Sequence, residues 1–488
     1  MSSVNAAAIT LGIDLGTSAV KVVALGLDDR IITESASAFP TIGSLPLQAE
    51  QDPADWLRAV SIAMGQLQQT LPRTLGADWT ERVAAIGLTG QLPSLVCLSK
   101  DGPVAPAIIW KDGRADAWAA KRLGESRRKQ IYARTGMPID GRYLAPMLAY
   151  HFTDRLGEIR CVLSAKDYLL YELTGLCLTE PSTAAGYGIY DLHQRAFSEE
   201  LGGFWNLPHR LLPDIQPANS LAGPLSPAGA TLLGLPPGVP VSMGAADSVC
   251  ASYAMGGLDP GIVSISLGSS AVVLGAIDQL QLDAGSRYLV TPHVEDGWYG
   301  REMDLLASGS GYRWLSDLFS WQEGDLDRCA ASSTPGARGL IFTPYLAGGE
   351  QGALWNPNLR GAILGLNLQH TASDLARAFL EGVFFEVRRC IEVLAETAPV
   401  KSVMVSGNIT RSPSSTQLLA DILLRPVGTV LEQSPAAIGA ALQARRLTGL
   451  TDASAATFAR RSTMVVAPAN AAYGPIYERY LAQAARCD

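Results

Sequence analysis

Two segments of the chain share one pattern of hydrophobic and polar positions. Each has an apolar run rich in β-branched residues, a short turn of small residues, and a second apolar run. Such runs predict strands, and the glycine between them predicts a tight turn. The two turns read Leu15-Gly16-Thr17-Ser18-Ala19-Val20 and Leu267-Gly268-Ser269-Ser270-Ala271-Val272.

The spacing of this repeat bears on domain organisation. Its copies lie about half the chain apart, which predicts two similar domains. We expect an N-terminal domain over 1–239 and a C-terminal domain over 240–488, because the turn-rich segment 221–239 separates them. Chance similarity between two turns of small residues is the alternative that the repeat alone leaves open.

Apolar residues at helical spacing occur in both halves. Asp52-Pro53 is a typical N-cap and first-turn pair, and Ser373 and Ser434-Pro435 are further candidate starts. The stripes that follow the first two starts are Trp56, Val60, Met64, Leu67 and Leu71, and Leu375, Phe379, Val383, Val387, Cys390 and Leu394. The third helix, over 436–444, contains Gly439, which allows another backbone to approach closely. Helices between strands indicate an α/β fold.

Composition excludes several classes of protein. The 488 residues are 48% hydrophobic and 17% charged, which is typical of a folded chain. The formal charge of −8 argues against nucleic-acid binding. We expect neither a membrane span nor a signal peptide. Seven cysteines without a CxxC pair suggest neither a zinc site nor a disulfide framework, so we expect a cytoplasmic protein.

The two glycine turns are candidate phosphate sites. Successive backbone N–H groups and hydroxyls without side-chain bulk suit phosphate oxygens. The chain has no Gly-Lys dipeptide and therefore no P-loop. The segment 309–314 begins like a dinucleotide fingerprint but has Trp314 at the third glycine, which makes that signal weak.

Asp14 precedes the first turn and has Ser266 as its counterpart in the second. A carboxylate beside phosphate suggests a bridging Mg²⁺, which prefers oxygen ligands. The alternative is an aspartate that only caps the turn.

Asp247 follows an apolar strand and the small residues 244–246. Such an acid at a strand end is a candidate general base, because phosphoryl transfer to an alcohol needs an acceptor for the hydroxyl proton. The alternative is an N-cap of the segment 248–254.

Together these motifs resemble the FGGY carbohydrate kinases, and within them the xylulokinases. The resemblance covers nearly the whole chain, in order. The matching stretches include 12–18, 87–91, 110–114, 145–148, 166–169, 244–247, 267–270, 345–350, 360–366 and 380–383. It implies a duplicated actin-like/ribonuclease H-like ATPase fold, with two large domains around a cleft.

The resemblance also implies a role for each matching residue. Asp247 matches the family's catalytic base, and Asp14 matches the aspartate near Mg²⁺ and the transferred phosphate. The residues matched to ATP are Gly16, Thr17, Ser18, Gly268, Ser269, Gly309, Arg313, Gly407 and Asn408. Asn408 replaces a glycine, and asparagine is the residue other than glycine that best tolerates a left-handed backbone.

The expected sugar side is Gln91, Leu92, Trp110 and Arg114, together with Asp247. Arg114 is either a ligand or a structural anchor. Xylulokinases carry Gln-Met-His-Gly where this chain has Gln91-Leu92-Pro93-Ser94, so a different substrate stays open.

We therefore expect an ATP- and Mg²⁺-dependent kinase for a terminal hydroxyl of a ketopentose or related polyol, with D-xylulose the first candidate. Kinases for ribulose, glycerol or erythritol, and an inactive sugar or nucleotide sensor, are the alternatives. The expected partners are the sugar and ATP, with neither nucleic acid nor membrane. Analogy with related kinases adds a homodimer.

Overall fold

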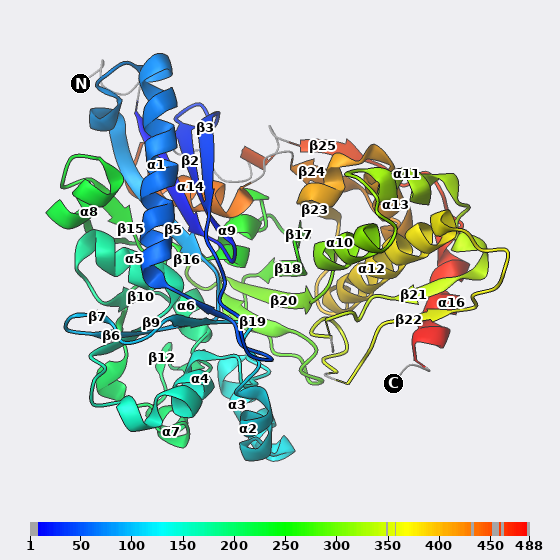
Figure 1. Ribbon diagram of the computed structural model, residues 1–488, viewed down its shortest axis with the longest axis horizontal. Coiled ribbons are helices and arrows are strands. Elements are labelled where there is room, and N and C mark those ends of the chain that lie inside the picture. Colours follow the sequence, from blue (N-terminus) through cyan, green and yellow to red (C-terminus); the bar gives the residue numbers. More distant parts are fainter. Residues whose placement is uncertain are drawn as a thin grey trace.

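Two mixed sheets, one from each half of the chain, organise the molecule (Figure 1). The computed structural model describes residues 8–347, 350–356, 358–430, 434–450, 458–459 and 463–485. Across the first sheet the order is β14 (Leu221–Pro224), β15 (Pro240–Ser242), β5 (Val83–Gly90), β1 (Ile9–Leu15), β2 (Ala19–Gly26) and β3 (Ile31–Ala38), and β16 (Ala245–Ala246) also pairs with β5. Across the second it is β19 (Leu289–Pro292), β20 (Tyr299–Leu305), β18 (Ala271–Ile277), β17 (Ile262–Leu267), β23 (Ser402–Ser406), β24 (Val427–Val430) and β25 (Thr463–Val466).

Six strands of the second sheet repeat the order and directions of six strands in the first. β1 pairs antiparallel with β2 and parallel with β5, as β17 does with β18 and β23. The parallel run continues to β15 and β24, and each sheet then ends in an antiparallel strand. Asp14 lies beside Thr89, and Ser266 lies beside Ser406 in the equivalent place. The predicted duplication of an α/β unit is therefore confirmed.

The long helices follow the predicted stripes. In α1 (Pro53–Leu75), the predicted stripe is buried and Asp52 accepts a hydrogen bond from the amide of Ala54 at 2.9 Å. In α12 (Ala372–Ala395), Thr371 and Asp374 form a reciprocal capping box. The start predicted at Ser373 was therefore two residues late, because the threonine reaches the amide of Asp374 and the serine does not cap.

The helix α14 (Pro435–Leu447) comes from the second half of the chain but packs on the first sheet and on α9 (Asp247–Ala254). Figure 1 shows it, in orange, among the blue and green elements of the first half. The approach needs glycine on both sides. A Cβ at Gly12 would lie 1.8 Å from the carbonyl oxygen of Ala437, and one at Gly439 would lie 1.9 Å from that of Cys250.

Smaller elements complete each half. In the N-terminal lobe they are β4 (Glu50–Gln51), β6 (Ser94–Ser99), β7 (Gly102–Pro103), β8 (Ala107–Ile109), β9 (Cys161–Leu163), β10 (Leu178–Thr179), β11 (Tyr190–Asp191), β12 (Ala196–Phe197), β13 (Asp214–Ile215), α2 (Asp116–Arg122), α3 (Glu125–Thr135), α4 (Leu144–His151), α5 (Ala165–Thr174), α6 (Pro181–Ala185), α7 (Glu199–Phe204) and α8 (Pro227–Leu233). In the C-terminal lobe they are β21 (Ile341–Thr343), β22 (Ala362–Leu364), α10 (Gly309–Leu318), α11 (Asp325–Ser332), α13 (Pro413–Leu423) and α16 (Tyr473–Ala484).

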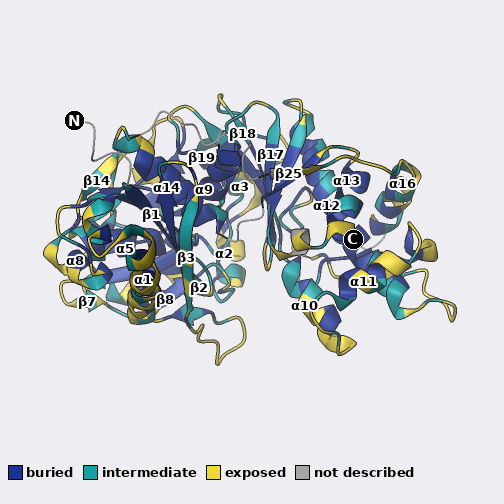
Figure 2. Ribbon diagram, turned by 90° about the horizontal axis from the view of Figure 1, so that it is seen from above, coloured by how far each residue is buried: buried dark blue, intermediate teal, exposed yellow. Residues whose placement is uncertain are grey.

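The two lobes contact each other where α3 of the N-terminal lobe lies beside β19 of the C-terminal lobe. The amide of Val290 on β19 donates to the carbonyl of Gly136 at 2.9 Å, and the Tyr132 hydroxyl donates to the carbonyl of Tyr288 at 2.8 Å. One apolar cluster runs through this contact, and Figure 2 shows the central strands of both sheets in the colour of buried residues. Among the described residues, no helix has the length and apolarity needed to cross a bilayer.

The predicted domain boundary at residue 239 falls between β14 and β15. These two strands pair with each other in the first sheet. A division of the chain at this point stays a prediction.

Candidate active site

A cavity of about 190 Å³ lies between the two lobes. Both predicted turns reach it, the first through Thr17 and the second through Ser270. Leu92 and Trp110 contribute apolar surface on the N-terminal side, and Asp247 lies in the wall. The cavity therefore gathers residues from each half of the repeat.

Asp247 is the first residue of α9 and is half-buried. Its side chain does not cap the helix; Oδ1 accepts a hydrogen bond from the neighbouring Ser248 amide at 2.8 Å. Burial, reinforced by the nearby Asp14 carboxylate, raises the pKa of Asp247 to about 7. A carboxylate with this pKa has the proton affinity that suits a general base at neutral pH.

The segment before Asp247 is shaped by Gly244. This residue has φ of +71°, and a Cβ there would lie 1.8 Å from the carbonyl oxygen of Leu88. Glycine thus lets the chain press against β5 and turn towards the cavity.

Asp14 lies near the end of β1 and is 5% exposed. Its Oδ1 is buried and has no hydrogen-bond partner among the described residues. Burial raises the pKa of Asp14, and the charge of Lys21, its neighbour across the β1–β2 ladder, opposes that shift. The turn itself is closed by the backbone, because the Gly16 amide donates to the carbonyl of Ala19 at 3.1 Å.

An unpaired carboxylate oxygen beside a candidate phosphate-binding turn fits a Mg²⁺ ligand. Within the described ranges, no group of three or more acidic, histidine or cysteine side chains forms a cation site. Mg²⁺ is commonly held by one or two carboxylates with phosphate and water oxygens. Asp14 would be such a ligand.

The expected nucleotide residues of the C-terminal lobe converge on the second turn. Gly309 begins α10, and its amide donates to the carbonyl of Gly268 at 2.9 Å. Arg313 lies one turn further along α10 and donates to the Ser269 hydroxyl at 3.3 Å.

Gly407 approaches the same turn, since a Cβ on it would lie 2.1 Å from the carbonyl oxygen of Leu267. The left-handed conformation falls on Gly407, with φ of 112°, while the exposed Asn408 begins a 3-10 turn. The expected left-handed role of Asn408 is therefore taken by the glycine.

Comparison with known proteins decides the family. Residues 9–254 match the N-terminal domain, and residues 263–447 the C-terminal domain, of the FGGY family of carbohydrate kinases. The chain belongs to this family.

Several relatives span almost the whole FGGY chain. Gluconokinase of Bacillus subtilis is 26% identical over 461 residues, covering 91% of this chain and 88% of its own. Xylulose kinase of Klebsiella pneumoniae is 30% identical over 421 residues, covering 84% of each chain. The crystal structure of xylulose kinase from Lactobacillus acidophilus superposes with a TM-score of 0.89 at 24% identity over 98% of both chains, which establishes the shared two-domain fold.

Two residues that were expected to bind the sugar do not line the cavity among the described residues of this FGGY chain. They are Gln91 and Arg114. Gln91 is buried and donates to Gln51 at 2.8 Å, and Gln51 in turn donates to the carbonyl of Thr17 at 2.8 Å. Gln91 therefore supports the first turn from behind. Arg114 bridges Asp112 and Glu50, with N–O distances of 2.7 and 2.5 Å, and so has the place of a structural anchor.

Leu92 and Trp110 do line the cavity of this kinase. The Trp110 indole donates to the Thr17 hydroxyl at 3.1 Å. Leu92 reaches the wall because residue 186 is a glycine, where a Cβ would lie 2.6 Å from the leucine side chain. Ser18 lies exposed beside Thr17 in the first turn.

The structure adds cavity residues that the motifs did not indicate. Glu302 and Asp304 project from β20 of the C-terminal lobe, and Ser248 donates to Glu302 at 2.7 Å. Burial raises the pKa of Asp304 to about 7 and that of Glu302 well above its usual range. Two acids at positions i and i+2 of a strand share a face, so the spacing of Glu302 and Asp304 was the available signal.

Asp140 and Arg142 also line the cavity. They form an ion pair, with Arg142 Nε 3.1 Å from Asp140 Oδ2. Gln351 of the C-terminal lobe lies 3.3 Å from the same carboxylate. Asp140 and Arg142 lie in the loop between α3 and α4, which has no apolar periodicity, so no pattern in the sequence pointed to them.

Proposed function

We propose that this FGGY kinase transfers the γ-phosphoryl group of ATP to a terminal hydroxyl of an uncharged ketose or polyol, with D-xylulose the first candidate. The observation that carries the proposal is the cavity wall, where Asp247 lies close enough to Asp14 for the charge of one to raise the pKa of the other. A proton acceptor beside a candidate Mg²⁺ ligand, between two phosphate-type turns, suits phosphoryl transfer to an alcohol.

Each group would have one task. Asp247 accepts the proton of the sugar hydroxyl while that oxygen bonds to phosphorus, and ADP leaves with the electrons of the broken P–O bond. Asp14 would hold Mg²⁺, which offsets negative charge on the transferred group. The turns at 16–18 and 268–270 offer N–H groups and hydroxyls to the phosphates, with Gly309, Arg313, Gly407 and Asn408 on the nucleotide side.

The charge of the cavity favours an uncharged sugar over a sugar acid. Asp140, Asp247, Glu302 and Asp304 line it, and Arg142 is the single basic side chain among the described lining residues. Because Arg142 is paired with Asp140, its charge is largely compensated. No uncompensated cation among the described lining residues can pair with a substrate carboxylate, whereas hydroxyl groups can bond a carboxyl in either protonation state. This supports a ketose or polyol more than gluconate.

Apolar surface shapes the same cavity. Leu92, Trp110 and Trp355 offer faces against which the C–H groups of a sugar can pack. Since Leu92 cannot hydrogen-bond a sugar hydroxyl, discrimination between ketoses would rest on the carboxyl groups opposite. Kinases for ribulose, glycerol or erythritol therefore stay the alternatives within the class.

The second candidate function is a sugar or nucleotide sensor without catalysis. The pair Asp14 and Asp247 argues against it, because binding alone does not need a base at the acceptor.

The deciding experiment measures ADP release with D-xylulose, D-ribulose, glycerol, erythritol and gluconate, each with and without Mg²⁺, in the wild type and in Asp247→Asn. We expect Mg²⁺-dependent turnover with an uncharged substrate that is lost in the variant. Binding of nucleotide and sugar without turnover would favour the sensor, and turnover with gluconate alone would overturn the assignment to uncharged sugars. The cytoplasmic location and the homodimer stay predictions.

A further inference from the structure

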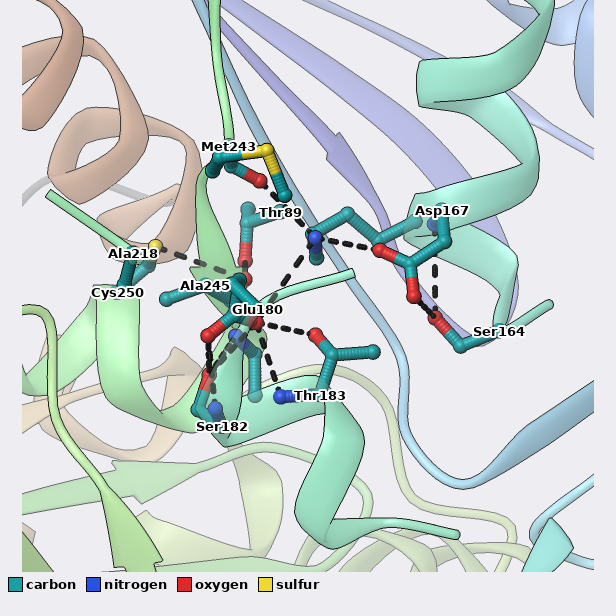
Figure 3. Close-up of polar contacts among 12 residues, drawn as sticks. Thr89, Ser164, Asp167, Glu180, Ser182, Thr183, Ala218, Met243, Ala245 and Cys250 are labelled. Carbon is teal, nitrogen blue, oxygen red and sulfur yellow. Dashed lines mark hydrogen bonds and ion pairs between the residues drawn. The ribbon is translucent and has the colours of Figure 1, made fainter. Parts of the chain in front are cut away.

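The four residues before Asp247 are held by buried side chains at three backbone atoms. The Lys166 ammonium donates to the carbonyl of Met243 at 3.0 Å, and the Thr89 hydroxyl donates to that of Ala245 at 2.8 Å. The amide of Ala246 donates to the Ser182 hydroxyl at 2.9 Å. These three side chains are at most 1% exposed. Figure 3 shows Thr89, Ser182 and the backbone of 243 and 245 converging from separate elements.

Glu180 fixes the direction of the Ser182 hydroxyl. Its carboxylate accepts hydrogen bonds from the Ser182 amide at 2.7 Å and from the Ser182 hydroxyl at 2.9 Å, and it also binds Thr183 (Figure 3). A serine hydroxyl has one proton to donate. Because that proton points to Glu180, a lone pair of the oxygen is left to receive the Ala246 amide.

The Lys166 ammonium compensates the charge of the buried carboxylates in this cluster. It lies 2.7 Å from Asp167 and 3.8 Å from Glu180, and all three side chains are buried. A buried charge that lost its partner would be strongly unfavourable. The ion pairs therefore hold the cluster together, and the backbone of 243–246 is hydrogen-bonded to it.

Ordinary strand pairing contributes little to the same segment. β16 consists of Ala245 and Ala246, which face Thr89 and Gly90 of β5. These two pairs are the only strand pairing of β16 within the described part of the chain, and β16 follows the positive-φ Gly244, so the ladder alone fixes the backbone before Asp247 weakly. The side-chain contacts from Thr89, Lys166 and Ser182 therefore fix the position of the backbone that leads into Asp247.

We propose that Glu180 and Ser182 are positioning residues that hold the Ala245–Ala246 peptide, directly before Asp247, so that the Asp247 carboxylate faces the acceptor hydroxyl. The inference rests on the proposed role of Asp247. Neither residue exchanges a proton with the substrate; both act through the backbone.

The first test compares Ser182→Ala and Glu180→Gln with the wild type. A base displaced by about 1 Å loses on the order of 100-fold in rate, so we expect kcat to fall about 10- to 100-fold in each variant. KM for the sugar and Kd for ADP should stay within about twofold. Ser182→Thr, which restores the hydroxyl, should recover kcat to within about threefold.

A matched control is Ser242→Ala. Ser242 is buried two residues before Gly244, and its hydroxyl has no hydrogen-bond partner among the described residues. The same chemical change there removes no contact to Asp247, so kcat should be unchanged. Equal losses in Ser182→Ala and Ser242→Ala, or a loss confined to KM, would overturn the inference.

A double-mutant cycle separates positioning from general support of the fold. If Ser182 acts through Asp247, Ser182→Ala should not lower the residual rate of Asp247→Asn further, because residues that act as a unit are not additive. An additive loss would show that Ser182 acts elsewhere. Normal turnover in Asp247→Asn alone would instead refute the proposed base, which is a distinguishable result.

Discussion

Replacing Asp247 by asparagine should make the protein inactive and more stable at once. The same burial that raises the pKa of Asp247 to about 7 makes its ionised form costly in the native state. Asparagine keeps the oxygen that accepts the Ser248 amide and carries no charge. The loss of function and the gain in stability therefore have one cause.

The size and sign of this gain follow from the two pKa values. Between the ordinary value of 3.8 and the folded value of about 7, the native state binds more protons than the unfolded chain, so stability falls as pH rises through this window. A shift of about 3 pH units corresponds to at most about 4 kcal/mol above pH 7. Because Asp247 faces the cavity and is only half-buried, screening reduces this value, and we expect about 1–3 kcal/mol at pH 8.

The assay is the thermal midpoint of the wild type and of Asp247→Asn from pH 4 to pH 8. In a domain of 150–250 residues, each kcal/mol raises the midpoint by about 2–4 °C. The difference should grow with pH and vanish near pH 4. The exposed Asp154 provides the control, because Asp154→Asn makes the same chemical change outside the cavity. Equal midpoints at pH 8, or an offset independent of pH, would refute the electrostatic reasoning.

Three further outcomes are expected. In the wild type, kcat/KM should fall as pH drops below about 7 with a single acid limb, because protonated Asp247 cannot accept a proton; a flat profile from pH 5 to 8 would contradict its role. Asp304→Asn should raise the kcat/KM ratio of gluconate to D-xylulose by about fivefold at pH 8, where Asp304 is ionised, since the removed charge weakens repulsion by about 1 kcal/mol; an unchanged ratio at pH 8 would exclude the charge filter. Gly439→Val should lower the free energy of unfolding by about 3 kcal/mol or more, because the side chain forces α14 away from α9. Gly65→Ala, whose Cβ meets nothing within 4 Å, should raise the free energy of unfolding by about 0.5–1 kcal/mol. Chemical denaturation of both variants checks this, and an unchanged stability of Gly439→Val would mean that the two helices can separate.

Local patterns predicted the parts of the fold that depend on local chemistry. The strands around Gly16 and Gly268, and the stripe of α1, follow from apolar period and turn residues. The start of α12 differs from the one predicted at Ser373, because Thr371 and Ser373 are both candidate caps and only the reciprocal contact of Thr371 with Asp374 distinguishes them.

The candidate site was predictable only in part. Asp14, Asp247, Thr17 and Trp110 lie in motifs and reach one region. Gln91 belongs to such a motif too, yet its side chain turns to Gln51, and sequence spacing cannot reveal that direction. The acids of β20 come from the opposite lobe, so their approach to Asp247 depends on how the lobes pack.

The contact between α14 and the first sheet has a consequence for dissecting the protein. Gly12 and Gly87 have no side chains, so the backbone of α14, from near the other end of the chain, packs directly on the backbone of β1 and β5. A fragment containing residues 1–239 would expose that backbone surface. A fragment beginning at 240 would contain α14 but lack β1 and β5, the strands on which α14 packs. The two halves of the duplication are thus interlocked. Fragment complementation, in which both pieces fold together, is the form in which a severed chain should regain its structure.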